Sequence, residues 1–134
     1  YTNLFFAKCD IIRIQKKNKY GFVDRKLKPV TPIEFDKATD FENNLAVVSK
    51  GINSLLIDKT GKVIYSIKNG YIESFYNHYL VKQNDLVGLI NQDGKILLNT
   101  EFETINKVYK ELYVCLKNNE LLLFNSETLT LKKL

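Results

Sequence analysis

The sequence predicts an all-β fold in which about four antiparallel three-strand meanders follow one another and stack as in a propeller or a β-solenoid. Three observations support this class. One apolar motif recurs every 33 or 34 positions. Turn residues separate short apolar runs. No segment shows the 3.6-residue apolar period of an amphipathic helix. A period of this length indicates a small unit whose copies bury their apolar faces against one another.

The most regular element is a five-residue apolar segment that ends in Asp or Asn. Its four copies are residues 20–24, 54–58, 87–91 and 121–125. The final residues of successive copies lie 34, 33 and 34 positions apart. Two large apolar residues are adjacent in each copy, as Leu56 and Ile57 are. Because side chains alternate across a strand, this adjacency predicts a middle strand that is covered on both faces.

An apolar run before each middle strand predicts its hairpin partner. A triplet in this run recurs with steps of 34 and then 33 positions. Its copies are Phe41, Leu45 and Val47, then Phe75, Tyr79 and Val81, then Val108, Leu112 and Val114. The linkers between the two strands are short and mostly rich in Asn, which tolerates the left-handed backbone of tight hairpin turns.

A second turn follows each middle strand. The turn at residues 58–62 recurs at 91–95, where Gly61 and Gly94 are placed for a positive φ. A third strand is expected next, for example at residues 62–67, and a longer connection then leads to the next meander.

The chain is expected to form a single repeat domain over residues 1–134. The predicted divisions are a partial repeat 1–18, repeats 19–52, 53–85 and 86–119, and a partial repeat 120–134. The two partial repeats add up to one unit, so two arrangements stay open: a ring whose ends share a sheet, and a segment of a longer array. Since neither a signal peptide nor an initiator Met is present, we expect a longer gene product.

Composition is that of a globular domain, with 45% hydrophobic and 26% charged residues. The net charge of +5 comes almost wholly from lysines spread through every repeat, and Arg13 and Arg25 are the only arginines. This distribution disfavours a nucleic-acid partner, because base readers favour clustered arginine. No apolar run approaches the roughly 20 residues of a membrane-spanning helix.

The cysteine and histidine content argues against a zinc site. Cys9, Cys115 and His78 are the only residues of these two types, too few for the usual four ligands. Two buried thiols are expected for the cysteines, and a Cys9–Cys115 disulfide is the alternative.

Residues 19–24, Lys-Tyr-Gly-Phe-Val-Asp, resemble the WG (KWG) repeat family of bacterial proteins, with Tyr20 in place of the family's tryptophan. Residues 87–95 form a second copy, and residues 32–36 resemble the family's Pro-x-x-Tyr-Asp stretch. Leu55 and Leu122 stand where the family has glycine. The resemblance implies a β-repeat scaffold that is not tied to an enzymatic activity. It also implies an exported or cell-envelope location.

The densest aromatic stretch, residues 71–79, supplies the candidate binding residues Tyr76 and His78, which have no equivalent among the repeat core positions. The alternative is that this stretch belongs to the core. Two other patterns are given their ordinary interpretation. The Asn91–Lys95 segment is a turn rather than a calcium loop, and Glu101 and Glu103 are solvated. No catalytic residue, cofactor or metal ligand is predicted.

The expected function is therefore that of a non-enzymatic scaffold or binding module for a protein or a glycan. A structural spacer in a longer repeat array is the alternative, and a hydrolase is a distant third. Oligomerisation through uncapped repeat ends is a further expectation.

Overall fold

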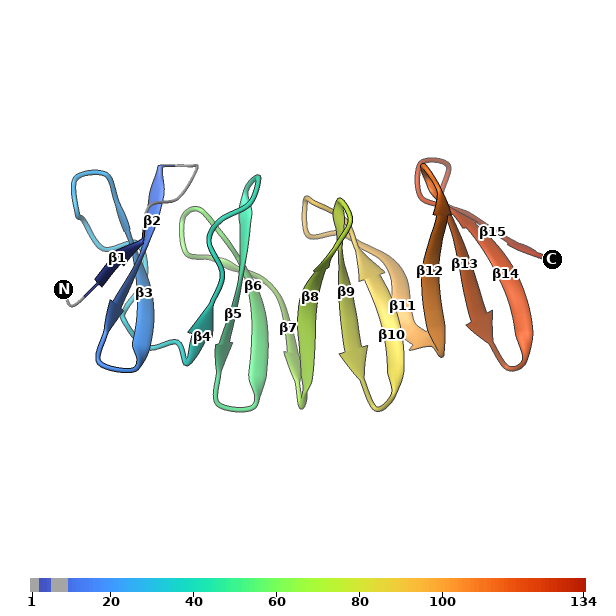
Figure 1. Cartoon of the computed structure of the whole chain (residues 1–134), viewed down its shortest axis with the longest axis horizontal. Coiled ribbons are helices and arrows are strands. Elements are labelled where there is room, and N and C mark those ends of the chain that lie inside the picture. The colour runs from blue at the N-terminus through green and yellow to red at the C-terminus, as the bar shows by residue number, and fades with distance from the viewer. Residues whose placement is uncertain (1–2, 6–9) are drawn as a thin grey trace.

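The protein is an open row of four antiparallel β-sheets, seen in a computed structural model that describes residues 3–5 and 10–134 (Figure 1). The first sheet contains β1 (Asn3–Phe5), β2 (Ile11–Lys16) and β3 (Lys19–Asp24). The second contains β4 (Lys37–Ala38), β5 (Leu45–Lys50), β6 (Asn53–Asp58) and β7 (Val63–Lys68). The third contains β8 (Gly70–Phe75), β9 (His78–Gln83), β10 (Leu86–Ile90) and β11 (Ile96–Phe102). The fourth contains β12 (Thr104–Tyr109), β13 (Leu112–Lys117), β14 (Glu120–Asn125) and β15 (Thr130–Lys133).

The predicted all-β tandem class is confirmed, and the described residues contain no helix. Every sheet is a meander in which strands adjacent in sequence are also hydrogen-bonded neighbours. The connections expected between meanders add a strand to the predicted three, because β4, β8 and β12 each begin a new sheet. The row is open rather than ring-shaped, with β1 and β15 at its opposite ends (Figure 1).

Sheets and predicted repeats have the same length but a different phase. Each predicted repeat begins at a middle strand, for example at residue 53, whereas the second sheet extends from residue 37 to residue 68. A sequence repeat therefore joins the later strands of one sheet to the first strands of the next.

The middle strands of the first three sheets pack on both faces, as predicted, whereas Leu123 of the fourth sheet is only partly buried. Leu56 and Ile57 are 0% and 1% exposed. Ile57 belongs to the apolar cluster between the first and second sheets, and Leu56 belongs to the cluster between the second and third. Because the second and third sheets each contribute to two such clusters, burial in one sheet depends on its neighbours.

The predicted register of the preceding strand is wrong by one residue. In the hairpins, Val47 pairs with Leu56, Leu80 with Leu89, and Val114 with Leu123. Equivalent residues are thus Val47, Leu80 and Val114, which are 33 and 34 positions apart rather than 34 and 33. The apolar runs have large side chains on both faces, so their pattern alone did not fix which residue faces which neighbour.

The Asp or Asn that ends each middle strand closes the following turn with its side chain. Oδ1 of Asp24, Asp58 and Asn91 accepts hydrogen bonds from the backbone N–H groups two and four residues later, at 2.9–3.0 Å. Asn125 accepts from residues 127 and 128. Gly61 and Gly94 have φ of 88° and 86° in these turns, as predicted. The recurring Asp/Asn is therefore a turn-closing acceptor.

This role predicts a specific pH dependence for Asp58. Its pKa is held below the ordinary 3.8, first by the hydrogen bond from the Thr60 hydroxyl and then by the Thr60 and Lys62 backbone N–H groups. A lowered folded-state pKa means that ionised Asp58 stabilises the fold above pH 3.8, and that this stabilisation is lost as pH falls through the lower folded value. We expect Asp58→Asn to keep the turn, as Asn91 does, and to reduce the loss of stability on acidification.

Urea unfolding at pH 7 and pH 3 measures this difference. Asp58→Ala is the matched control, because it removes the acceptor altogether and is expected to cost about 1 kcal/mol already at pH 7. An unchanged pH dependence in Asp58→Asn would contradict the interpretation.

The second residue of the five-residue middle-strand segment is glycine in the first and third sheets and leucine in the second and fourth. The pairing of the segment that follows the middle strand differs between the two kinds of sheet. A Cβ on Gly21 would lie 2.8 Å from the Pro32 carbonyl oxygen, and one on Gly88 would lie 2.7 Å from that of Leu98. In these two sheets the next segment is irregular or bulged. Where Leu55 and Leu122 replace glycine, the next strand pairs in regular register there. The glycines thus permit a close backbone crossing.

Candidate binding site between the third and fourth sheets

The candidate residues Tyr76 and His78 lie at the turn that joins β8 to β9. Phe75 and His78 form the last strand pair, so Tyr76 and Asn77 make a two-residue turn. Tyr76 has φ of 57° and its side chain is 66% exposed. The ring of Tyr76 meets that of Phe75 edge-on, with 4.9 Å between centroids. The turn therefore presents an aromatic ring to solvent.

The fourth sheet completes the site through β12 and β13. Lys107 Nζ lies 4.9 Å from the centroid of the Tyr76 ring, a cation–π distance. The His78 ring stacks on Tyr113 with 6.0 Å between centroids and an angle of 29° between planes. Tyr113 is buried, so it anchors His78 against the interface of the two sheets.

A hollow of about 390 Å³ opens beside the stacked rings of His78 and Tyr113. Amide, ammonium, carboxylate and aromatic groups share its lining, which includes Asn77, His78, Gln92, Lys107, Lys110 and Glu111. A smaller hollow of about 100 Å³ shares Asn77, His78 and Gln92 with the first and is also lined by Tyr76. Tyr76 and His78 thus border a polar depression rather than the core.

The surroundings of His78 favour the neutral form of its imidazole ring. Partial burial lowers its pKa below the ordinary 6.5, the Asn77 carbonyl opposes part of this shift, and the nearby Lys107 ammonium adds to it. His78 Nδ1 lies 3.0 Å from that carbonyl oxygen. The ring can therefore offer a stacking face and a neutral nitrogen to a ligand.

Sequence reasoning missed Lys107, Tyr109 and Lys110, which the β12–β13 hairpin brings to the same edge. The Tyr109 side chain is 60% exposed, and Lys110 Nζ lies 5.2 Å from its ring centroid. Lys110 occupies the same turn position as Tyr76, one period later. An alignment of the repeats would therefore have identified Lys110 as a candidate binding residue.

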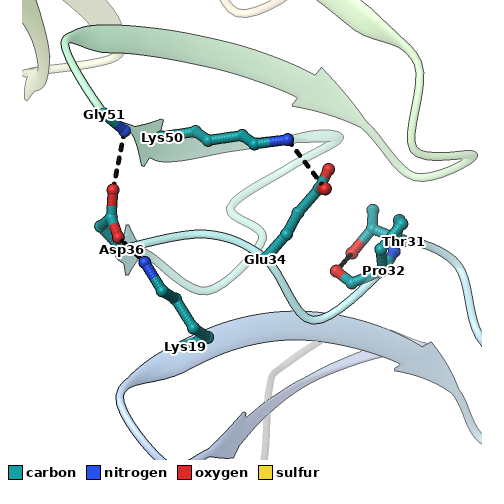
Figure 2. Close-up of polar contacts among 7 residues, drawn as sticks. All are labelled: Lys19, Thr31, Pro32, Glu34, Asp36, Lys50 and Gly51. Carbon is teal, nitrogen blue, oxygen red and sulfur yellow. Dashed lines mark hydrogen bonds and ion pairs between the residues drawn. The ribbon is translucent and has the colours of Figure 1, made fainter.

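A second polar cluster joins the first and second sheets (Figure 2). The Asp36 carboxylate forms an ion pair with Lys19 and accepts a 2.7 Å hydrogen bond from the Gly51 backbone N–H. The Lys50 ammonium lies 2.9 Å from the Glu34 carboxylate. The bond from Lys19, followed by that from Gly51, lowers the pKa of Asp36. The charged groups of this cluster pair with one another, so we interpret the cluster as a structural link between the two sheets.

The remaining candidates do not converge on a site. Glu101 forms an ion pair with Lys117 at 3.4 Å, and Asn91 Oδ1 is engaged by its own turn. Among residues 10–134 no three His, Cys, Asp or Glu side chains gather as a metal ion would require. Cys115 is a buried free thiol, and burial raises its pKa to about 11. Cys9, the other half of the disulfide alternative, lies outside the described residues.

Fold and site together define a class of protein: an all-β tandem repeat with a propeller-like succession of sheets and a polar, aromatic-edged depression between two of them. Within the part of the chain that the structure describes, no helix is long and apolar enough to cross a bilayer. Residues 20–51 and 88–120 match the model of the WG containing repeat, so the resemblance is confirmed and the chain carries WG repeats. No curated protein matches the sequence.

A solved structure shows a similar fold. The chain is similar to Kluyvelomyces marxianus Hsv2 at 16% identity and a TM-score of 0.50, over 90% of this chain and 44% of that one. It is also similar to KlHsv2 with loop 6CD replaced by a Gly-Ser linker, at 10% identity and a TM-score of 0.43, over 94% of this chain and 48% of that one. The chain spans less than half the length of these structures.

Proposed function

We propose that the chain is a non-enzymatic binding module that holds a protein or a glycan partner at the depression between its third and fourth sheets. The observation that carries this proposal is Tyr76. An aromatic ring that is 66% exposed stands in a left-handed turn and lines the smaller hollow, while the adjoining Asn77 and His78 also line the hollow of ligand size.

The backbone of Tyr76 makes this choice of residue informative. Equivalent turns carry Asn43, Tyr76 and Lys110, with φ of 58°, 57° and 44°. Asn tolerates the left-handed region, whereas a bulky side chain there costs about 1 kcal/mol. Tyr76 and Lys110 thus stand where Asn, the residue that this backbone favours, stands in the second sheet. Such strain is typical of functional positions.

The chemistry of the depression suits recognition better than catalysis. Exposed tyrosines combine large apolar area with a polar tip, which makes them frequent anchors of binding energy. Amides and lysines around them offer hydrogen bonds and charge. His78, the one histidine of the chain, has a backbone carbonyl as its hydrogen-bond partner. A catalytic dyad would instead join it to a nucleophile or a carboxylate.

Tyr76→Asn is the variant that separates binding from folding. It removes the ring but restores the residue that the turn prefers, so the backbone gain of about 1 kcal/mol offsets the lost ring contacts. We expect the free energy of unfolding in urea to stay within about 1 kcal/mol of the native value. Affinity is expected to fall at least roughly tenfold, as for an interface anchor.

The ligand is found by screening the native chain against a glycan array and a displayed random-peptide library, and titration calorimetry then measures its affinity. Tyr71→Asn is the matched control, because the Tyr71 side chain is 51% exposed on β8 and lines neither of the two hollows at His78. An empty result from both libraries, or equal losses in the two variants, would count against the proposal.

A structural spacer is the second candidate function. The observation that favours it is the apolar outer side of the fourth sheet, where Leu121 is 51% exposed. A spacer would lose nothing measurable on Tyr76→Asn, so the same titration separates the two functions.

A further inference from the structure

The larger hollow at His78 is lined by charged side chains of both signs. Its lining includes Lys107 on β12, Lys110 and Glu111 in the β12–β13 turn, and Glu127 in the β14–β15 turn. These turns lie on the same edge of the row as the β8–β9 turn (Figure 1). Two ammonium and two carboxylate groups therefore border one opening.

These four charged groups have no ion-pair partners. Elsewhere in the fourth sheet opposite charges do pair, as Lys117 and Glu101 do at 3.4 Å. In the part of the chain that the structure describes, none of the four side chains at the hollow forms an ion pair. Lys107 and Glu111 are also half-buried. The hollow thus keeps charges of both signs available to a ligand.

Aromatic rings hold the two ammonium groups in place. Lys107 Nζ lies 4.9 Å from the centroid of the Tyr76 ring, and Lys110 Nζ lies 5.2 Å from that of Tyr109. An ammonium over a ring keeps its hydrogen-bond donors, since the ring attracts the charge and not a particular N–H group. Both lysines can therefore still bind an anionic group.

Two side-chain amides complete the set of unused polar groups. Asn77 and Gln92 line both hollows, and no hydrogen bond among the described residues involves their side-chain amides. Each amide offers a donor and an acceptor, which match the C=O and N–H groups of a peptide bond.

We propose that the partner held at this depression is a polypeptide segment that carries both acidic and basic side chains, an inference that rests on the proposed binding function. Its carboxylates pair with the two lysines, and its basic groups pair with the two glutamates. Its backbone amides bond to Asn77 and Gln92.

A glycan fits this set of groups less well. A neutral sugar offers no opposite charge to the four groups that its binding would partly desolvate. An acidic glycan suits the lysines but brings its anions near Glu111 and Glu127, and like charges side by side oppose binding. Stacking of a sugar on Tyr76 is also restricted, because Lys107 already lies over that ring.

Selection from a displayed random-peptide library, beside a glycan array, tests the inference. Peptides that the native chain recovers and Tyr76→Asn does not are expected to carry both acidic and basic residues. Synthetic copies of these peptides are then titrated by calorimetry. Lys110→Glu and Glu127→Lys are each expected to weaken binding at least about fivefold, because each turns an attraction into a repulsion.

Lys68→Glu and Glu103→Lys are the matched controls, with the same two charge changes. Both native side chains are exposed and line neither hollow at His78, so affinity is expected to stay within twofold. A synthetic peptide whose acidic residues are replaced by lysine is expected to regain affinity for Lys110→Glu. A loss of structure could not produce this rescue.

The outcomes separate the partner from the site. A glycan ligand that Tyr76→Asn loses would overturn this inference and leave the proposed function standing. Recovered peptides with only one sign of charge, or controls that lose as much affinity as the test variants, would also overturn it. Empty results from both libraries would count against the site itself, and the inference would fall with it.

Discussion

Gly88→Ala is expected to cost about 3 kcal/mol of unfolding free energy, at the upper end of overpacking effects. The new Cβ would lie 2.7 Å from the Leu98 carbonyl oxygen and 2.9 Å from the Thr100 backbone nitrogen. Both contacts are with backbone, so a rotamer change cannot relieve them, and the bulged pairing of β10 with β11 would have to shift. Urea unfolding followed by circular dichroism gives the value.

Gly51→Ala is the control for the glycine substitution. Gly51 has φ of 60° but open space around its Cβ position, so only the backbone cost of about 1 kcal/mol applies. If Gly88→Ala were no more costly than Gly51→Ala, the close crossing of β10 and β11 would not be the reason for glycine in the repeat.

Leu89→Ala is expected to cost about 3–4 kcal/mol, because Leu89 is 0% exposed and a cavity would remain between the third and fourth sheets. Leu123→Ala removes the same atoms from the equivalent position of the last sheet and is expected to cost about 1 kcal/mol, because that side chain is already partly exposed. The difference between the two variants thus measures how much coverage by a further sheet contributes to the free energy of unfolding.

Both leucine variants are compared by urea unfolding. Equal costs would mean that the inter-sheet clusters are not what stabilises each sheet.

The fold class was predictable because the middle strand combines a fixed period with adjacent apolar pairs such as Leu56 and Ile57. The first strand of each sheet was not. In β8 only Ile72 is buried, and β4 contains two residues. These strands form because the edge of the next hairpin offers unpaired backbone groups, and that information is not local in sequence.

The candidate site was predictable only in part. Tyr76 and His78 stood out because they break the repeat's core pattern. Lys107 and Lys110 did not, since exposed lysines occur throughout the chain. What makes them part of the site is the stacking of the fourth sheet on the third, which carries Lys107 to the Tyr76 ring from almost a full repeat later in the sequence.

The alternation of glycine and leucine along the middle strands has a consequence for how the chain is built. The interval from Gly21 to Gly88 is two periods of the repeat and equals the interval from Leu55 to Leu122. The segment that follows the middle strand crosses Gly21 and Gly88 with irregular pairing, whereas it pairs in register at Leu55 and Leu122. The first two sheets and the last two sheets are thus equivalent two-sheet modules, in each of which a sheet with glycine at this position precedes a sheet with leucine. Grafting or recombination should exchange such modules in pairs of sheets, with the joint at the loop before β8.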